Sequence, residues 1–220
     1  MLDITPFLLS FKLASITTII LFIVCVPFAW FLSQTKSKFK PILEAITALP
    51  IVLPPSVLGF YMLILLSSNS PIGVFLDKYF DIKLAFSFTG LVIASLFYSM
   101  PFMIQPLQNG FESLNKNMIE ASYIAGKSKF QTILKVVLPN IKPSILTAIV
   151  ITFAHTIGEF GVVLMVGGSI PDQTKVASVA IYEMVQMMDY RSAHIYSIFM
   201  LFLSFIVLIS VYSFNKKSKY

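Results

Sequence analysis

Five stretches of the sequence are apolar and long enough to cross a lipid bilayer as helices. Such a helix needs roughly 20 mainly apolar residues to span about 30 Å of hydrocarbon. Four of the stretches lack Asp, Glu, Lys and Arg: residues 13–35, 45–66, 84–107 and 194–214. A fifth, residues 145–166, is interrupted in its second half by His155 and Glu159. We therefore expect an all-α integral membrane protein with about five transmembrane helices.

The composition excludes an ordinary soluble domain. Of the 220 residues, 57% are apolar and only 12% are charged, and the mean hydropathy is +0.85. Soluble domains contain about 45–50% apolar and about 25% charged residues. Because five spans of roughly 20 residues use nearly half of the chain, we expect one transmembrane domain over residues 1–220.

The basic residues divide unequally between the two sides of the expected bundle. The side of the N-terminus receives five: Lys12, Lys78, Lys83, Lys175 and Arg191. The opposite side receives eleven: Lys36, Lys38, Lys40, Lys116, Lys127, Lys129, Lys135, Lys142, Lys216, Lys217 and Lys219. Basic residues in short loops stay in the cytoplasm. We therefore expect the N-terminus outside and the C-terminus in the cytoplasm, which accounts for the net charge of +6 without nucleic-acid binding.

The longest loop on the lysine-rich side covers about residues 108–142, which is too long for a simple connection. Apolar residues recur at helical spacing on both sides of Gly126: Met118, Ala121, Ile124 and Ala125, then Phe130, Ile133, Leu134 and Val137. This pattern predicts two short helices flanking a glycine hinge. Periodicity alone allows them either to lie on the membrane surface or to dock on a partner.

A spaced motif in this loop favours docking. Glu120-Ala121-Ser122 is followed after three residues by Gly126 and after nine more by Val136, with Leu138-Pro139 one residue further on. The pattern resembles the cytoplasmic loop signature of permease subunits of ATP-binding-cassette (ABC) importers, with Ser122 and Val136 replacing Ala and Ile. The resemblance implies a set of residues that couple the permease to an ATPase: Glu120, Ala121, Ser122, Ala125, Gly126, Val136, Leu138 and Pro139.

Two further strings narrow the resemblance to one group of permeases. Leu49-Pro50-Ile51-Val52-Leu53-Pro54-Pro55 and Gly158-Glu159-Phe160-Gly161 look like segments of the molybdate permease subunit and its tungstate and sulfate relatives. The similarity covers about residues 11–210. It implies the type I importer permease fold, a multi-pass protein of the bacterial inner membrane, and translocation of molybdate. Tungstate, sulfate or another oxyanion remains the alternative substrate.

The resemblance also implies partners. These are a second copy of the chain, two copies of an ATPase subunit that uses ATP and Mg, and an external, periplasmic molybdate-binding protein. The sequence contains no Walker, HExxH or GxSxG motif. We therefore expect a transport subunit that is not itself an enzyme and binds no cofactor.

Prolines, glycines and ionisable residues inside the spans are candidates for the pathway or its gate. Pro54 and Pro55 each remove a backbone donor, so we expect a kink or break that serves packing or gating. His155 and Glu159 are four residues apart, so on a helix they share a face and could hydrogen-bond. Both structural support and pathway lining remain open for this pair. The other candidates are Gly158, Phe160 and Gly161.

An intramembrane hydrolase that uses His155 and Glu159 as acid and base is the alternative from another class. No nucleophile or orienting third group stands at a recognisable spacing from the pair. We expect no metal site, because zinc needs three or four ligands and the only other histidine is His194, at the edge of the last span.

Overall fold

The computed structural model describes residues 3–217, and all regular structure within them is helical. The α-helices are α1 (Thr5–Gln34), α2 (Lys40–Val52), α3 (Pro55–Leu66), α4 (Pro71–Phe80), α5 (Phe88–Glu112), α6 (Lys116–Ile124), α7 (Lys129–Thr132), α8 (Leu138–Asn140), α9 (Lys142–Gly158), α10 (Gly161–Gly167), α11 (Ala177–Gln186) and α12 (Tyr190–Lys217). A π-helical turn, η1 (Ile133–Val137), joins α7 to α8. The all-α prediction is confirmed. Lys219 and the C-terminal residue lie outside the described residues.

Among the described residues, three helices are long and apolar enough to cross a membrane in one piece, namely α1, α5 and the part Tyr190–Ile209 of α12. Two bent pairs supply further spans if each pair is counted as one. The pair α2 and α3 bends by 108°, and the run Lys129–Asn140 meets α9 at 74°. Length and composition therefore allow three to five spans, in agreement with the expected number.

The second expected span, residues 45–66, is broken in the middle. α2 ends at Val52, Leu53 is extended (φ −70°, ψ 136°), and α3 begins at Pro55. A proline ring pushes the preceding residue out of the α-helical region, and both Leu53 and Pro54 precede a proline. The break expected at these prolines is confirmed, and its bend is far sharper than that of a kinked helix.

The fourth expected span, residues 145–166, does not form a single continuous helix. α9 begins earlier, at Lys142, and ends at Gly158. Glu159 is extended (φ −69°, ψ 136°), and α10 begins at Gly161. Glycine weakens a helix, and here one glycine stands on each side of the break. The apolar character of the segment concealed this interruption.

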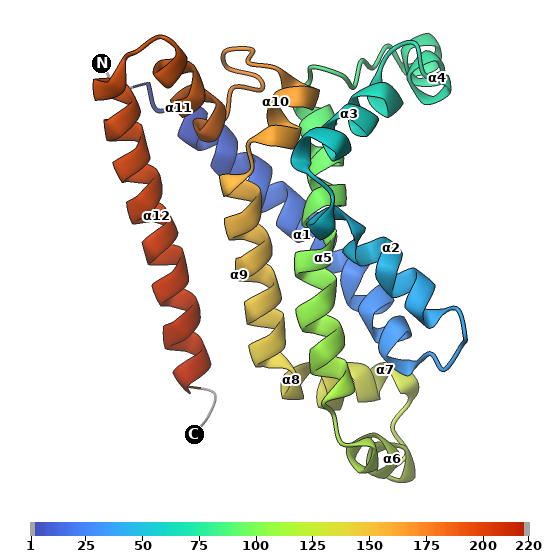
Figure 1. Ribbon diagram of the computed structural model, residues 1–220. Coiled ribbons are helices and arrows are strands. Elements are labelled where there is room, and N and C mark those ends of the chain that lie inside the picture. The colour runs from blue at the N-terminus through green and yellow to red at the C-terminus, as the bar shows by residue number, and fades with distance from the viewer. Residues whose placement is uncertain (1–2, 218–220) are drawn as a thin grey trace.

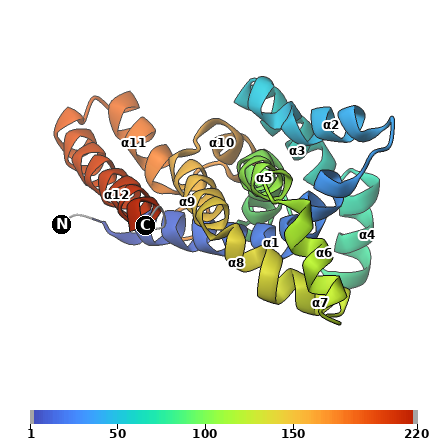
Figure 2. The same cartoon turned by 90° about the horizontal axis from the view of Figure 1, so that it is seen from below.

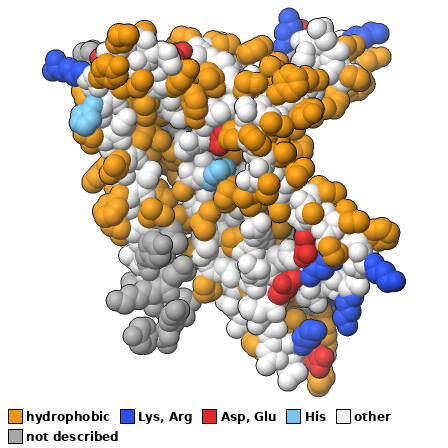
Figure 3. Space-filling model, in the orientation of Figure 1, with side chains coloured by type: hydrophobic (Ala, Val, Ile, Leu, Met, Phe, Trp, Pro, Cys, Tyr) orange, Lys and Arg blue, Asp and Glu red, His pale blue; other side chains and the backbone are white. Residues whose placement is uncertain are grey.

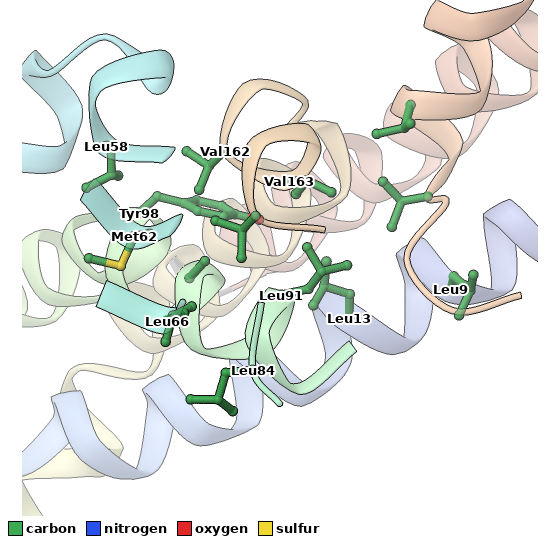
Figure 4. Packing of buried hydrophobic residues seen from close by; sticks show 14 residues of the cluster. Leu9, Leu13, Leu58, Met62, Leu66, Leu84, Leu91, Tyr98, Val162 and Val163 are labelled. Atoms are coloured by element: carbon green, nitrogen blue, oxygen red, sulfur yellow. The ribbon is translucent and has the colours of Figure 1, made fainter. Parts of the chain in front are cut away.

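Helices α1, α5 and α9 form the centre of the bundle, with α2 and α3 on one side and α12 on the other (Figures 1 and 2). An upper cluster of buried side chains joins α1, α3, α5 and α10, and Figure 4 shows Leu13, Met62, Leu91 and Val162 within it. A lower cluster joins α1, α5 and α9 to the loop that contains α6–α8. The bundle therefore has a core at each end, and a third, smaller cluster joins α1, α11 and α12.

Helix α12 is peripheral. Its first turns pack on α1, where Phe7 lies with its ring centroid 4.8 Å from that of Tyr196 and 4.6 Å from that of Phe199. Further along, large apolar side chains such as Leu201 and Phe202 are exposed. Figure 3 shows hydrophobic side chains over the middle of the molecule and charged ones mainly towards its two ends. This distribution suits a helix bundle surrounded by hydrocarbon.

Candidate functional site

The two broken spans meet at a small cavity in the middle of the bundle. The cavity has a volume of about 140 Å³. It is lined by residues of α2, α3, α5, α9, α10 and the two breaks: Pro50, Ile51, Leu53, Pro55, Leu58, Tyr98, Phe102, His155, Glu159 and Val162. Three of the predicted gate residues, Pro55, His155 and Glu159, are therefore brought together. Pro54, Gly158, Phe160 and Gly161 lie at the two breaks that form the walls.

Helices α3 and α10 approach each other closely beside this cavity. A Cβ atom placed on Gly161 would lie 2.7 Å from Cβ of Pro55, and one placed on Gly59 would lie 2.8 Å from Cβ of Met165. Real Cβ atoms do not come so close to other carbon atoms. The glycines therefore let the two breaks touch, whereas Gly158 has open space around its Cα.

Glu159 is held by backbone contacts at the second break. Its Oε1 accepts a hydrogen bond from the amide of Val162 at 3.1 Å, and its carbonyl oxygen accepts one from the hydroxyl of Ser178 at 2.7 Å. The carboxylate thus satisfies an amide in the first turn of α10, which has no partner four residues earlier. Glu159 supports this turn and also faces the cavity.

His155 packs between aromatic rings of α5. Its ring centroid lies 3.9 Å from that of Phe102 and 5.6 Å from that of Tyr98. The spacing of His155 and Glu159 allowed a hydrogen bond between them, but within residues 3–217 the structure contains none, because the helix ends between the two residues. Both side chains still line the same cavity.

Tyr98 and Phe102 also line the cavity, although no motif in the sequence marked them as site residues. They are four residues apart on α5 and therefore share one face of that helix. A further contact holds α5 to α9 next to them, where the hydroxyls of Ser99 and Thr156 lie 2.8 Å apart. The i, i+4 aromatic spacing beside Pro101 was the signal available in the sequence.

The loop predicted between the third and fourth spans protrudes from one end of the bundle (Figure 1). Helix α6 ends before Gly126, which has φ +76°, and α7 follows from Lys129. The prediction of two short helical segments around a glycine turn is confirmed. A side chain on Gly126 would meet nothing within 4 Å, so only the backbone conformation requires glycine here.

The motif residues of the loop have different surroundings. Glu120, Ala121 and Ala125 are exposed, but Ser122 is buried, and its Oγ lies 2.9 Å from Oγ1 of Thr132. Ser122, one of the residues that the resemblance assigns to coupling, therefore does not lie on the exposed surface of α6. Ser122 instead ties α6 to α7, because a helical residue next to the exposed alanine points to a different side.

The last part of the motif packs the loop against the lower cluster of buried side chains. Val137 and Ile141 are buried there, and Leu138 packs against the same cluster. Val136 is partly buried and Pro139 is exposed. Pro139 has no amide and its ring crowds the preceding turn, which accounts for the wider π-helical turn before it. A displacement of the loop would therefore shift side chains that pack against α1, α5 and α9.

The outer surface of the loop includes five large apolar side chains as well as charged ones. Ile124 is 88% exposed and Phe130 is 70% exposed, and Met118, Tyr123 and Leu134 are exposed beside them. These side chains make up the docking face, as we call it below. Helix α6, which carries Met118, Tyr123 and Ile124 of this face, lies beyond the ends of the long helices (Figure 1), where exposed apolar groups indicate contact with a partner.

The fold of the chain is that of type I ABC importer permeases. It superposes with a TM-score of 0.79 on a chain from the crystal structure of a bacterial ABC transporter that imports the acidic polysaccharide alginate, over 97% of this chain and 79% of that one, at 17% identity. A chain of the inward-facing MetNI methionine ABC transporter gives 0.75, over 98% and 95%, at 16% identity.

Residues 14–220 match the family described as binding-protein-dependent transport system inner membrane component, and the chain belongs to that family. It is a multi-pass membrane protein. Among relatives, it is 44% identical to the molybdenum transport system permease protein ModB of Azotobacter vinelandii, over 96% of this chain and 93% of that protein. It is 33% identical to the sulfate transport system permease protein CysT of Salmonella typhimurium, over 83% and 66%.

Proposed function

We propose that this chain is the permease subunit of an ATP-driven importer that carries molybdate across the inner membrane. The observation that carries this proposal is the 44% identity to the ModB permease over nearly the whole of both chains. Weaker similarity to sulfate permeases makes sulfate, tungstate or another oxyanion the alternative substrate. The chain is one transmembrane domain over residues 1–220, with the coupling loop at about residues 108–142.

The proposed topology places the N-terminus outside and the C-terminus in the cytoplasm. The excess of lysine on the side of the coupling loop supports this orientation. The start of α1 and the end of α12 lie at opposite ends of the bundle (Figure 1), as an odd number of crossings requires. The docking face then points into the cytoplasm, where ATP is available.

We place the coupling of ATP hydrolysis to transport in the loop. Glu120, Ala121 and Ala125 lie on the exposed surface of α6, next to Ile124, and would enter a groove of the ATPase subunit. Two ATPase subunits would use ATP and Mg, and this chain would bind no cofactor. Movement of the loop would reach α1, α5 and α9 through Val137, Leu138 and Ile141.

The cavity at the two broken spans is the proposed gate. The breaks at Pro54–Pro55 and at Gly158–Gly161 give α3 and α10 points about which they can tilt. A carboxylate repels an oxyanion, so Glu159 acts here as support for α10 and not as a ligand. The exposed apolar face of α2, which buries none of its residues, is available to a second copy of the chain.

Glu159→Gln should transport at nearly the rate of the unaltered protein, whereas Glu159→Ala should not. The Gln side chain keeps an oxygen that accepts from the Val162 amide, and Ala leaves that amide unpaired at a cost of about 1 kcal/mol. Thermal unfolding and uptake should be measured together for both variants. A Gln variant of normal stability with strongly altered uptake would show that the charge itself serves in the pathway.

Gly126→Val should weaken coupling, whereas Gly126→Asn should be tolerated. At φ +76° a β-branched residue is strained by about 1–3 kcal/mol, whereas Asn adopts this region readily. Both side chains would extend into open space, so bulk is not the cause. ATP-driven uptake in vesicles with equal amounts of inserted protein compares the two, and equal uptake by both would contradict a fixed turn at Gly126.

Reconstitution of the chain with its ATPase and binding-protein partners tests the proposed function. Uptake of radiolabelled molybdate, tungstate and sulfate should depend on ATP and on the external binding protein, and molybdate should be preferred. A preference for sulfate would show that sulfate is the substrate, and the assignment to ABC importer permeases would still hold. Hydrolytic activity of the solitary chain, lost in His155→Ala, would instead favour the intramembrane hydrolase.

A further inference from the structure

A second cavity lies at the lysine-rich end of the bundle, away from the two broken spans. Its volume is about 380 Å³, within the range of about 300–1,000 Å³ that small-molecule sites occupy. It is lined by the end of α1, the start of α2, the end of α5 and the start of α6: Ser33, Gln34, Thr35, Lys36, Lys40, Phe111, Glu112, Leu114, Lys116 and Ile119. We call it the lysine cavity.

The lining of the lysine cavity is positively charged. Three lysines face one glutamate, which leaves a net charge of +2. The Lys40 ammonium lies 2.8 Å from Glu112 and 3.6 Å from Glu44, so this lysine is already neutralised. Within residues 3–217, Lys36 and Lys116 form no ion pair. Lys36 and Lys116 are therefore two cations without an ion pair at the rim of the cavity, and both are exposed; with Glu44 counted, the charge around the cavity is +1.

The lysine cavity also has an apolar wall and lies at a defined depth. Phe111, Leu114 and Ile119 belong to or pack on the lower core. The cavity is formed where α1 ends at Gln34 and α5 ends at Glu112, and both helices are long enough to span the membrane. The end of a spanning helix lies at the level of the lipid headgroups. Charge and apolar surface thus meet at the depth where lipid phosphates and glycerol groups are found.

We propose that the lysine cavity binds the phosphate of an anionic phospholipid, with Lys36 and Lys116 as its charged partners. Basic pockets between transmembrane helices suit such headgroups. The apolar wall at Phe111 and Ile119 accommodates the glycerol and the first part of an acyl chain. Because Lys116 opens α6, the bound lipid holds the first turn of the coupling loop against the membrane.

The only tryptophan of the chain reports on this cavity. Trp30 stacks edge-on against Phe111 with ring centroids 5.1 Å apart, and its carbonyl accepts a hydrogen bond from Ser33, which lines the cavity. Bromine atoms on a lipid quench the fluorescence of a nearby indole. The full chain in phosphatidylcholine nanodiscs should therefore lose Trp30 fluorescence when brominated phosphatidylglycerol is added at a low mole fraction.

The double variant K36Q/K116Q should need about 30-fold more brominated phosphatidylglycerol for the same quenching, since each lysine contributes about 1 kcal/mol and about 1.4 kcal/mol is a tenfold change. Both side chains are exposed and unpaired within the described part of the chain, so folding should be preserved. The matched control is K127Q/K129Q, which removes two lysines from the same loop outside the cavity. In this control, brominated phosphatidylglycerol should quench Trp30 fluorescence as strongly as in the unaltered chain.

Three outcomes would overturn the proposal. Equal quenching by brominated phosphatidylcholine would show that the cavity does not select anionic lipid. Equal loss of quenching in K127Q/K129Q would show that only general surface charge attracts the lipid. Relief of quenching by millimolar inorganic phosphate would show that the cavity takes a free oxyanion in place of a lipid headgroup.

Discussion

An Ile124→Asp variant should fold and insert normally but lose nearly all ATP-driven uptake. Ile124 is 88% exposed on the docking face, so its replacement breaks no packing within the chain. An apolar residue at the centre of an interface contributes about 2 kcal/mol or more, and a charge buried there costs further free energy. We expect a loss of uptake of at least about 30-fold, together with loss of co-purified ATPase.

The matched control for this variant is Met187→Asp. Met187 is also an exposed apolar residue, at 67%, but it lies after α11 at the opposite end of the molecule from the coupling loop. Insertion should be equal for both variants, and only Ile124→Asp should release the ATPase. Normal uptake by a correctly inserted Ile124→Asp protein would show that the docking face is not the ATPase contact.

A Gly161→Val variant should be destabilised and should transport poorly. The added Cβ would lie 2.7 Å from Cβ of Pro55, whose ring cannot move aside. Overpacking of this kind costs about 1–3 kcal/mol, and the relief available is separation of α3 from α10. The two breaks that form the proposed gate would then no longer touch. Thermal unfolding in detergent and uptake in vesicles would measure the two effects.

Gly158→Ala is the control for that variant. Gly158 stands at the other side of the same break, and a Cβ on it would meet nothing within 4 Å. Alanine at this last position of α9 should leave uptake unchanged and leave stability equal or slightly higher. If Gly158→Ala and Gly161→Val behave alike, the close contact between the breaks is not what transport requires.

The sequence predicted the class of fold and the position of the loop with little loss. A long stretch without charged residues can cross lipid as a helix, because a helix hydrogen-bonds its own backbone groups. The approximate number of spans therefore followed from the number and length of these stretches. The glycine turn at Gly126 could be predicted because few other residues adopt positive φ. The break at Leu53 could also be predicted, because two consecutive prolines follow that residue.

The break at Glu159 could not be predicted in the same way. Hydropathy across residues 145–166 is high on both sides, and a glycine in a membrane helix does not by itself end it. At this break Gly161 lies against Pro55, and a contact between residues so far apart in the sequence is a tertiary feature. The hydrogen bond that the spacing of His155 and Glu159 allowed is absent within residues 3–217 for the same reason, since that spacing brings the two side chains together only on a continuous helix.

The surroundings of Ser122 also depended on tertiary contacts. The motif spacing places this residue beside Ala121, and composition alone does not say which of the two faces outward. The structure buries Ser122 against Thr132, a contact between helices that are separated by the glycine turn. Tyr98 and Phe102 were missed because aromatic residues at this spacing occur throughout membrane helices.

Labelling of one cysteine from each side of the membrane tests the central claim most directly. Cys25, the only cysteine of the chain, is buried, and Cys25→Ser with Ala121→Cys leaves one exposed thiol on α6. A membrane-impermeant thiol reagent should label it in inverted vesicles but not in right-side-out vesicles, and bound ATPase should protect it. Labelling in right-side-out vesicles would place the loop outside, where no ATPase can drive transport through it.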